Sequence, residues 1–128
     1  MSWYVDSSVI LASVFEEPNS IELSSVLKDH PVTSRLSSVE VLRAVTKFND
    51  LLVPRAQRLL SQFSFVDISN TILNRAESYS SEITVKASDA IHLATAETIS
   101  LLIEGVITLD KQMARNAKQL DLTVFEVA

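Results

Sequence analysis

The sequence predicts an α/β fold in which a mostly parallel sheet is covered by helices on both faces. Short apolar runs typical of strands alternate with segments whose apolar residues recur at helical spacing. The connections between these runs are long enough for right-handed crossovers. The chain has 128 residues, of which 47% are apolar and 21% charged, a composition typical of one globular domain. We therefore expect residues 1–128 to form a single domain.

The individual elements are assigned from apolar periodicity and from residues that favour helix starts. In the first half they are a strand at Trp3–Val5, a helix from Val9 to Phe15 that stops before Pro18, a helix from Asn19 with Glu22 at capping-box spacing, a strand at Val32–Thr33, and a long helix opened by Ser37 and continued by Val39, Leu42, Val45 and Phe48. In the second half they are a helix with Pro54 as its first residue, a strand from Phe63 to Ile68, a helix capped by Ser69 or Asn70, a helix capped by Ser88, a strand at Val106–Thr108, a helix from Met113 to Leu120 and a last strand at Val124–Val127. The sheet is therefore expected to have five strands.

Composition excludes several classes of site. The chain has no cysteine, which excludes disulfides and thiolate metal sites. Its only glycine is Gly105, which excludes Walker loops and dinucleotide fingerprints, because both need several glycines. No signal peptide or membrane-spanning run is visible, so we expect a cytoplasmic protein with no membrane partner.

The charge distribution is uneven. The net charge is −5, which is unfavourable for nucleic-acid binding, but residues 35–58 contain five basic and two acidic residues, a local net charge of +3. Such a run is more often a solvated helix face than a nucleic-acid surface. Lys111, Arg115 and Lys118 are expected to share a face of the last helix, with the same two interpretations. If these residues bind nucleic acid, the candidate contacts are Arg35, Arg43, Lys47 and Lys111.

Four acidic residues are predicted to lie at one edge of the sheet. Asp6 and Asp110 follow predicted strands, and Glu40 and Asp89 fall in the first turns of predicted helices. The binding crevice of an open α/β sheet lies beyond the carboxyl ends of its strands, where these residues would meet. Crowded carboxylates repel unless a cation neutralises them, and an all-oxygen site suits Mg²⁺ or Mn²⁺. Such an ion can lower the pKa of water and orient a phosphodiester for hydrolysis.

Each of these acids also has a structural interpretation. Asp6 and Asp110 could cap the helices that follow them. Glu40 could complete a capping box with Ser37. Asp89 could complement a helix dipole. Nearby His92 is expected to be buried and hydrogen-bonded rather than a metal ligand.

Four segments carry these acids in order over nearly the whole chain. They are Tyr4–Leu11 with Glu17–Pro18 after it, Thr33–Glu40, Ala87–Ala94 and Ile107–Lys111. In composition and spacing they resemble the motifs of PIN-domain proteins, especially VapC-type toxin ribonucleases. This resemblance implies helices around a five-stranded parallel sheet, a quartet of Asp6, Glu40, Asp89 and Asp110 that binds Mg²⁺ or Mn²⁺, and auxiliary hydroxyls from Ser8 and Thr108. It also implies an RNA substrate, a cognate antitoxin and a homodimer.

This chain departs from the motifs of the family at one place, and other classes of protein fit its acidic residues less well or differ in function. Some relatives have a further acid where this chain has Lys111, Gln112 and Met113, so the number of metal ions is left open. A noncatalytic PIN-like binding module is the alternative function. Haloacid-dehalogenase-type phosphatases need a second Asp at the position of Ser8, and response-regulator receivers need an acidic neighbour beside Asp6, so both fit less well.

Overall fold

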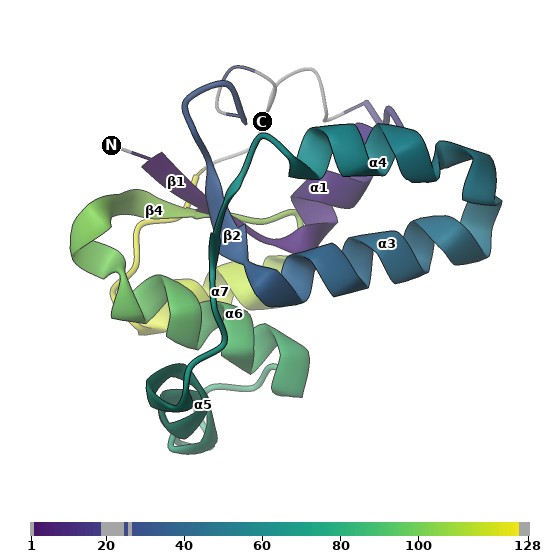
Figure 1. Ribbon diagram of the computed structural model, residues 1–128. Helices are drawn as coiled ribbons and strands as arrows, with labels where there is room; N and C mark the ends of the chain where they lie inside the picture. The colour runs from purple at the N-terminus through teal and green to yellow at the C-terminus, as the bar shows by residue number, and fades with distance from the viewer. Residues whose placement is uncertain (1, 19–24, 26, 126–128) are drawn as a thin grey trace.

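A parallel sheet forms the centre of the protein in the computed structural model, which describes residues 2–18, 25 and 27–125 (Figure 1). Its strands are β1 (Ser2–Val5), β2 (Val32–Ser34), β3 (Ser64–Val66) and β4 (Ile103–Ile107). They lie in the order β3-β2-β1-β4, and every pair is parallel. Because β1 lies between β2 and β4, the turns that follow these three strands meet at one edge of the sheet.

Helices connect the strands and cover both faces of the sheet. They are α1 (Ser7–Val14), α3 (Arg35–Asn49), α4 (Val53–Leu60), α5 (Asn70–Glu77), α6 (Ala87–Thr98) and α7 (Lys111–Gln119), with short 3₁₀ turns η1 (Asp50–Leu52) and η2 (Ser100–Leu102). Figure 1 shows α1, α3 and α4 together on one side of the sheet and α5 and α6 on the other. None of the helices in the described part of the chain has the length and apolarity needed to cross a bilayer.

In the described part of the chain, buried apolar residues form a cluster on each face of the sheet, between the strands and the helices. Val5 and Ile107 pack with α1, α3 and α4, whereas Tyr4 and Val106 pack with α6 and α7. Neighbouring strand residues thus enter opposite clusters, as the alternation of side chains along a strand requires. The predicted α/β/α sandwich with a mostly parallel sheet is confirmed.

The fifth strand predicted at the end of the chain is reduced to a single bridge in the described residues. Val124 forms an isolated parallel bridge with Val106, where a strand from Val124 to Val127 was expected. The amide of Val106 donates to Thr123 O at 2.8 Å, and the amide of Phe125 donates to Val106 O at 2.9 Å. Residues 126–128 lie outside the described residues, as does most of the helix expected from Asn19.

Several helices begin at other residues than expected. Ser34 caps α3 by accepting from the Leu36 amide at 3.0 Å, so the predicted start at Ser37 is wrong. Ser37 is instead buried inside the helix, 2.6 Å from the Thr33 hydroxyl. Ser88 does not cap α6, which starts at Ala87. Ser69 does cap α5, as predicted.

The single glycine is required where β4 meets the carboxyl-terminal segment. A Cβ added at Gly105 would lie 2.2 Å from Thr123 O, which is backbone and cannot rotate away. We therefore expect Gly105→Ala to lower the free energy of unfolding by about 1–3 kcal/mol, the usual cost of overpacking. Urea melts test this prediction, with Glu104→Ala on the same strand as an exposed control. Equal stability of the two variants would contradict it.

Candidate functional site

The four acidic residues lie on elements that reach the carboxyl edge of the sheet. Asp6 directly follows β1, and Asp110 directly precedes α7 after β4. Asp89 is in the first turn of α6, as expected. Glu40 is in the second turn of α3 rather than the first, because α3 starts at Arg35. The capping box between Ser37 and Glu40 is therefore wrong.

Asp6 is a buried carboxylate with hydrogen-bond donors on both oxygens. Its Oδ1 accepts from the Ser8 amide at 3.1 Å, the Ser8 hydroxyl at 2.6 Å and the Val9 amide at 3.4 Å, so Asp6 caps α1. Its Oδ2 accepts from the Thr108 hydroxyl at 2.5 Å. Burial raises the pKa of Asp6, and the hydroxyls of Ser8 and Thr108 and the His92 ring oppose this rise.

The hydroxyls of Ser8 and Thr108 join two strand ends. Besides binding Asp6, the Ser8 hydroxyl accepts from the Leu109 amide at 3.1 Å. The Thr108 hydroxyl accepts from the Asp110 amide, also at 3.1 Å. The turn that carries Asp110 is thus attached directly to Asp6.

Asp110 and Asp89 are more accessible than Asp6. Asp110 is exposed and caps α7, accepting from the Gln112 amide at 2.8 Å and the Met113 amide at 3.0 Å. Burial raises the pKa of the half-buried Asp89, and Lys86 opposes the rise, while Asp110 adds to it. His92 and Glu40 make smaller contributions of opposite sign. Asp89 therefore lies within electrostatic range of both Asp110 and Glu40.

Glu40 is held by a histidine from the opposite helical layer. His92 Nε2 lies 2.6 Å from Glu40 Oε1, and His92 Nδ1 lies 2.6 Å from the Tyr4 hydroxyl. His92 is 1% exposed. The prediction that His92 is buried and hydrogen-bonded is confirmed, but its partners could not be read from the sequence.

The donor chemistry of this edge fits a hard divalent cation. All four candidate ligands are carboxylates, the donors that Mg²⁺ and Mn²⁺ prefer. Burial disfavours the ionised forms of Asp6 and Asp89, and the charges of Asp110 and Glu40 add to this at Asp89, so a cation would stabilise both ionised forms. As the side chains are oriented, no three acidic or histidine residues in the described ranges form a ready metal-binding group. Asp6 and Asp110 are engaged as helix caps, so binding an ion would require adjustment of these side chains.

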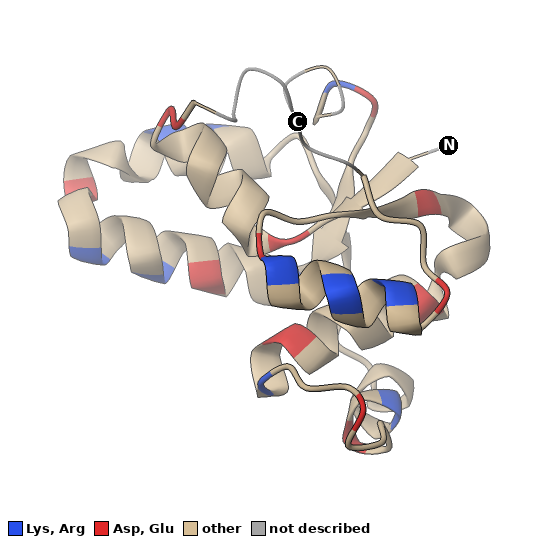
Figure 2. Ribbon diagram, turned by 180° about the vertical axis from the view of Figure 1, so that it is seen from behind, with Lys and Arg blue, Asp and Glu red and all other residues tan. Residues whose placement is uncertain are grey.

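The candidate RNA contacts lie on two helices beside this edge. Arg43 and Lys47 are exposed and follow Glu40 by three and seven residues, spacings that place all three on one face of α3. Arg35, at the start of α3, lies 5.5 Å from the Phe65 ring centroid and donates to the Ser38 hydroxyl. Lys111 begins α7, which carries a row of basic residues in Figure 2.

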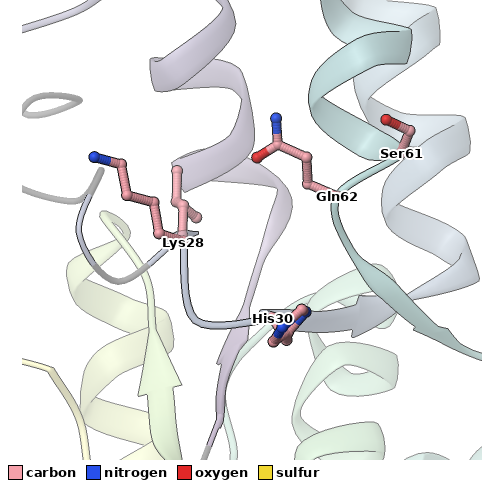
Figure 3. A pocket seen from close by; sticks show the side chains of 5 residues that line it. Lys28, His30, Ser61 and Gln62 are labelled. Atoms are coloured by element: carbon pink, nitrogen blue, oxygen red, sulfur yellow. The ribbon is translucent and has the colours of Figure 1, made fainter.

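A pocket elsewhere on the molecule is not part of this edge. It has a volume of about 390 Å³ and is lined by Leu27, Lys28, His30, Ser61 and Gln62 (Figure 3). His30 precedes β2 and Gln62 precedes β3, so the pocket lies at the amino-terminal edge of the parallel sheet.

Known proteins match this chain over nearly its full length. The family model described as PIN domain matches residues 3–119. Ribonuclease VapC46 from Mycobacterium tuberculosis is 31% identical over 123 residues, 94% of each chain. Ribonuclease VapC35 from the same species is 28% identical, over 94% of this chain and 93% of its own.

Solved structures share the fold. A toxin–antitoxin complex from Klebsiella pneumoniae contains a chain with a TM-score of 0.78 and 23% identity, covering 99% of this chain and 98% of its own. VapBC2 from Rickettsia felis, bound to a DNA fragment from its promoter, gives a TM-score of 0.70 and 15% identity, covering 98% and 100%. The family match spans most of the chain and contains every candidate acidic residue, and it agrees with the fold and the edge described above. This chain belongs to the PIN domain family.

Proposed function

We propose that this protein is an endoribonuclease that hydrolyses RNA phosphodiester bonds with the help of Mg²⁺ or Mn²⁺. The observation that carries the proposal is the placement of Asp6, Glu40, Asp89 and Asp110 at one edge of a PIN domain, with Asp89 electrostatically coupled to Asp110 and Glu40. The relatives named as ribonucleases support this activity.

The four carboxylates would hold the ion, and neighbouring groups would hold the carboxylates. A bound divalent cation supplies charge neutralisation at the phosphodiester and lowers the pKa of water. Ser8 and Thr108 donate to opposite oxygens of Asp6 and hold this buried carboxylate at the edge, from where it would adjust to bind the ion. The Asp110 turn is attached to the same hydroxyls, which keeps Asp110 beside Asp6.

The basic residues around this edge support an RNA substrate. Arg43 and Lys47 would contact RNA phosphates along α3, with Arg35 at its start and Lys111 on the other side beside Asp110. We further propose that the protein is the toxin of a toxin–antitoxin pair and that it forms a homodimer. The similarity to a chain of a toxin–antitoxin complex supports the antitoxin.

The dependence on a divalent metal and the cleavage mechanism can be tested together by identifying the chemical groups at the ends of the RNA products. Hydrolysis by activated water is expected to leave a 5′-phosphate and a 3′-hydroxyl, and to stop in EDTA until Mg²⁺ or Mn²⁺ is restored. A histidine-driven ribonuclease uses the 2′-hydroxyl and leaves a cyclic phosphate. Mass spectrometry of the products distinguishes these mechanisms.

The same assay also distinguishes a nuclease from the alternative, a noncatalytic binding module. RNA that is bound but stays intact with both metals would favour a noncatalytic PIN-like module. Cyclic phosphate ends that persist in EDTA would contradict the proposed chemistry and direct attention to His92.

A further inference from the structure

A buried chain of hydrogen bonds links elements from both helical layers of the sandwich. The Tyr4 hydroxyl lies 2.6 Å from His92 Nδ1, and His92 Nε2 lies 2.6 Å from Glu40 Oε1. Tyr4 is in β1, two residues before Asp6. His92 is in α6, three residues after Asp89. The chain therefore connects Glu40 to the two elements that carry the neighbouring candidate ligands.

The direction of proton donation follows from the chemistry of the two ends. A carboxylate only accepts hydrogen bonds, so His92 must donate a proton from Nε2 to Glu40. In a neutral imidazole, Nδ1 is then an acceptor, and the Tyr4 hydroxyl donates to it. Tyr4 and His92 are each 1% exposed, so water has little access to either group. The Glu40 carboxylate thus selects the tautomer protonated at Nε2, and the Tyr4 hydroxyl satisfies the Nδ1 acceptor of that tautomer.

Glu40 itself reaches from this buried contact toward the surface. Its side chain is 26% exposed, although His92 beneath it is almost fully buried. His92 engages one of its two carboxylate oxygens, Oε1. A carboxylate fixed through one oxygen has a defined direction for the other, which is how outer hydrogen-bond partners orient metal ligands in proteins.

We infer that His92 is a positioning residue, which holds Glu40 by Oε1 so that its other oxygen is presented to the divalent cation. This inference rests on the proposed function and assigns a task to a residue outside the carboxylate quartet. Tyr4 supports the task by fixing the imidazole. Packing alone would require a side chain that fills the space, whereas positioning requires a donor at the place of Nε2.

Two amide substitutions separate the donor from the packing. His92→Gln places its amide nitrogen near the position of Nε2, where it can still donate to Glu40. His92→Asn places its amide nitrogen near Nδ1, too far from Glu40 to donate. Calorimetric titration with Mn²⁺ is expected to show about 10–100-fold weaker binding for His92→Asn, the usual effect of losing an outer-shell partner. His92→Gln is expected to lose less than about tenfold.

Matched variants test whether the loss passes through Glu40. Leu93→Ala removes a buried neighbour on α6 and should lower stability without changing the Mn²⁺ affinity. In a Glu40→Gln background, His92→Asn should cause no further loss of affinity, because the group it positions is already altered. A further loss as large as in the parent would overturn the inference.

The remaining outcomes are also decisive. If the parent binds Mn²⁺ and cleaves RNA but His92→Asn binds the ion as tightly, only the positioning role is overturned. If the parent neither binds the ion nor cleaves RNA, the proposed function fails as well. Should His92→Asn fail to fold, Tyr4→Phe decides, because it removes only the hydroxyl that orients the imidazole. Weaker Mn²⁺ binding by Tyr4→Phe supports the inference, and unchanged binding overturns it.

Discussion

Replacing Asp6 by asparagine is expected to reduce RNA cleavage at least about 100-fold while leaving the fold intact. Loss of an outer-shell partner already costs 10–100-fold in many metal sites, and Asp6 is proposed as a ligand itself. Asparagine retains one side-chain oxygen that can accept from the Ser8 and Val9 amides, so α1 stays capped. Single-turnover cleavage assays and circular dichroism of the same preparation measure the two effects.

Asp6→Ala provides the matched comparison. It removes the cap and leaves the hydroxyls of Ser8 and Thr108 without their carboxylate partner, so we expect a loss of about 1–3 kcal/mol in the free energy of unfolding. If Asp6→Asn folds like the parent and cleaves RNA at the same rate, Asp6 is only a helix cap.

The stability of the metal-free parent should depend on pH through Asp6. Burial raises the pKa of this carboxyl in the folded state, so the folded protein holds the proton more tightly than the unfolded chain. The contribution of Asp6 to stability is therefore greatest at low pH and declines as the pH rises through the raised pKa. Asp6→Asn lacks this decline, so its stability relative to the parent should increase with pH in EDTA. Urea melts across the acidic range measure the difference, and a difference that decreases with pH would contradict the prediction.

The positions of Asp6, Asp89 and Asp110 at the carboxyl edge of the sheet could be predicted from the sequence, because strand ends and helix starts have local sequence signals. Asp6 and Asp110 follow apolar runs that form strands, and parallel strands bring their carboxyl ends to one side. Asp89 was placed in the first turn of its helix because the apolar periodicity after it is clear. For Asp6, Asp89 and Asp110, the strand ends and the helix start in the sequence thus indicate the edge of the sheet at which each residue lies.

The contacts within the edge could not be predicted in the same way. Ser34, Ser37 and Ser38 are all possible caps in one short segment, and only the tertiary position of β2 selects Ser34. Glu40 and His92 are 52 residues apart, and Tyr4 and His92 are 88 apart. No local pattern encodes such pairs, since they arise from packing of α3 and α6 against the two faces of the sheet.

Asp89→Asn is expected to abolish cleavage and most of the stabilisation by Mg²⁺, while leaving the metal-free protein unchanged or more stable. In EDTA, burial and the nearby Asp110 and Glu40 charges disfavour the ionised Asp89, as the direction of its pKa shift shows. Asparagine has nearly the same shape and no charge, so it removes this cost. Saturating Mg²⁺ stabilises a folded site by about 2.7 kcal/mol at 100 times its Kd, and this gain falls as the affinity falls.

The helix-dipole interpretation predicts the opposite sign for Asp89→Asn in EDTA. Asp89 is in the first turn of α6, where a negative charge contributes about 0.3–1 kcal/mol, so losing the charge would destabilise the protein and Mg²⁺ would not matter. Asp29→Asn is the matched control, since it changes the net charge equally at an exposed position before β2, on the opposite edge. Melting curves of the parent and both variants, each with EDTA and with Mg²⁺, decide between the interpretations. If Asp89 is a metal ligand, Mg²⁺ should raise the melting temperature of the parent and of Asp29→Asn but not that of Asp89→Asn. An equal shift in all three proteins would remove Asp89 from the proposed quartet, because the ion would then bind without it.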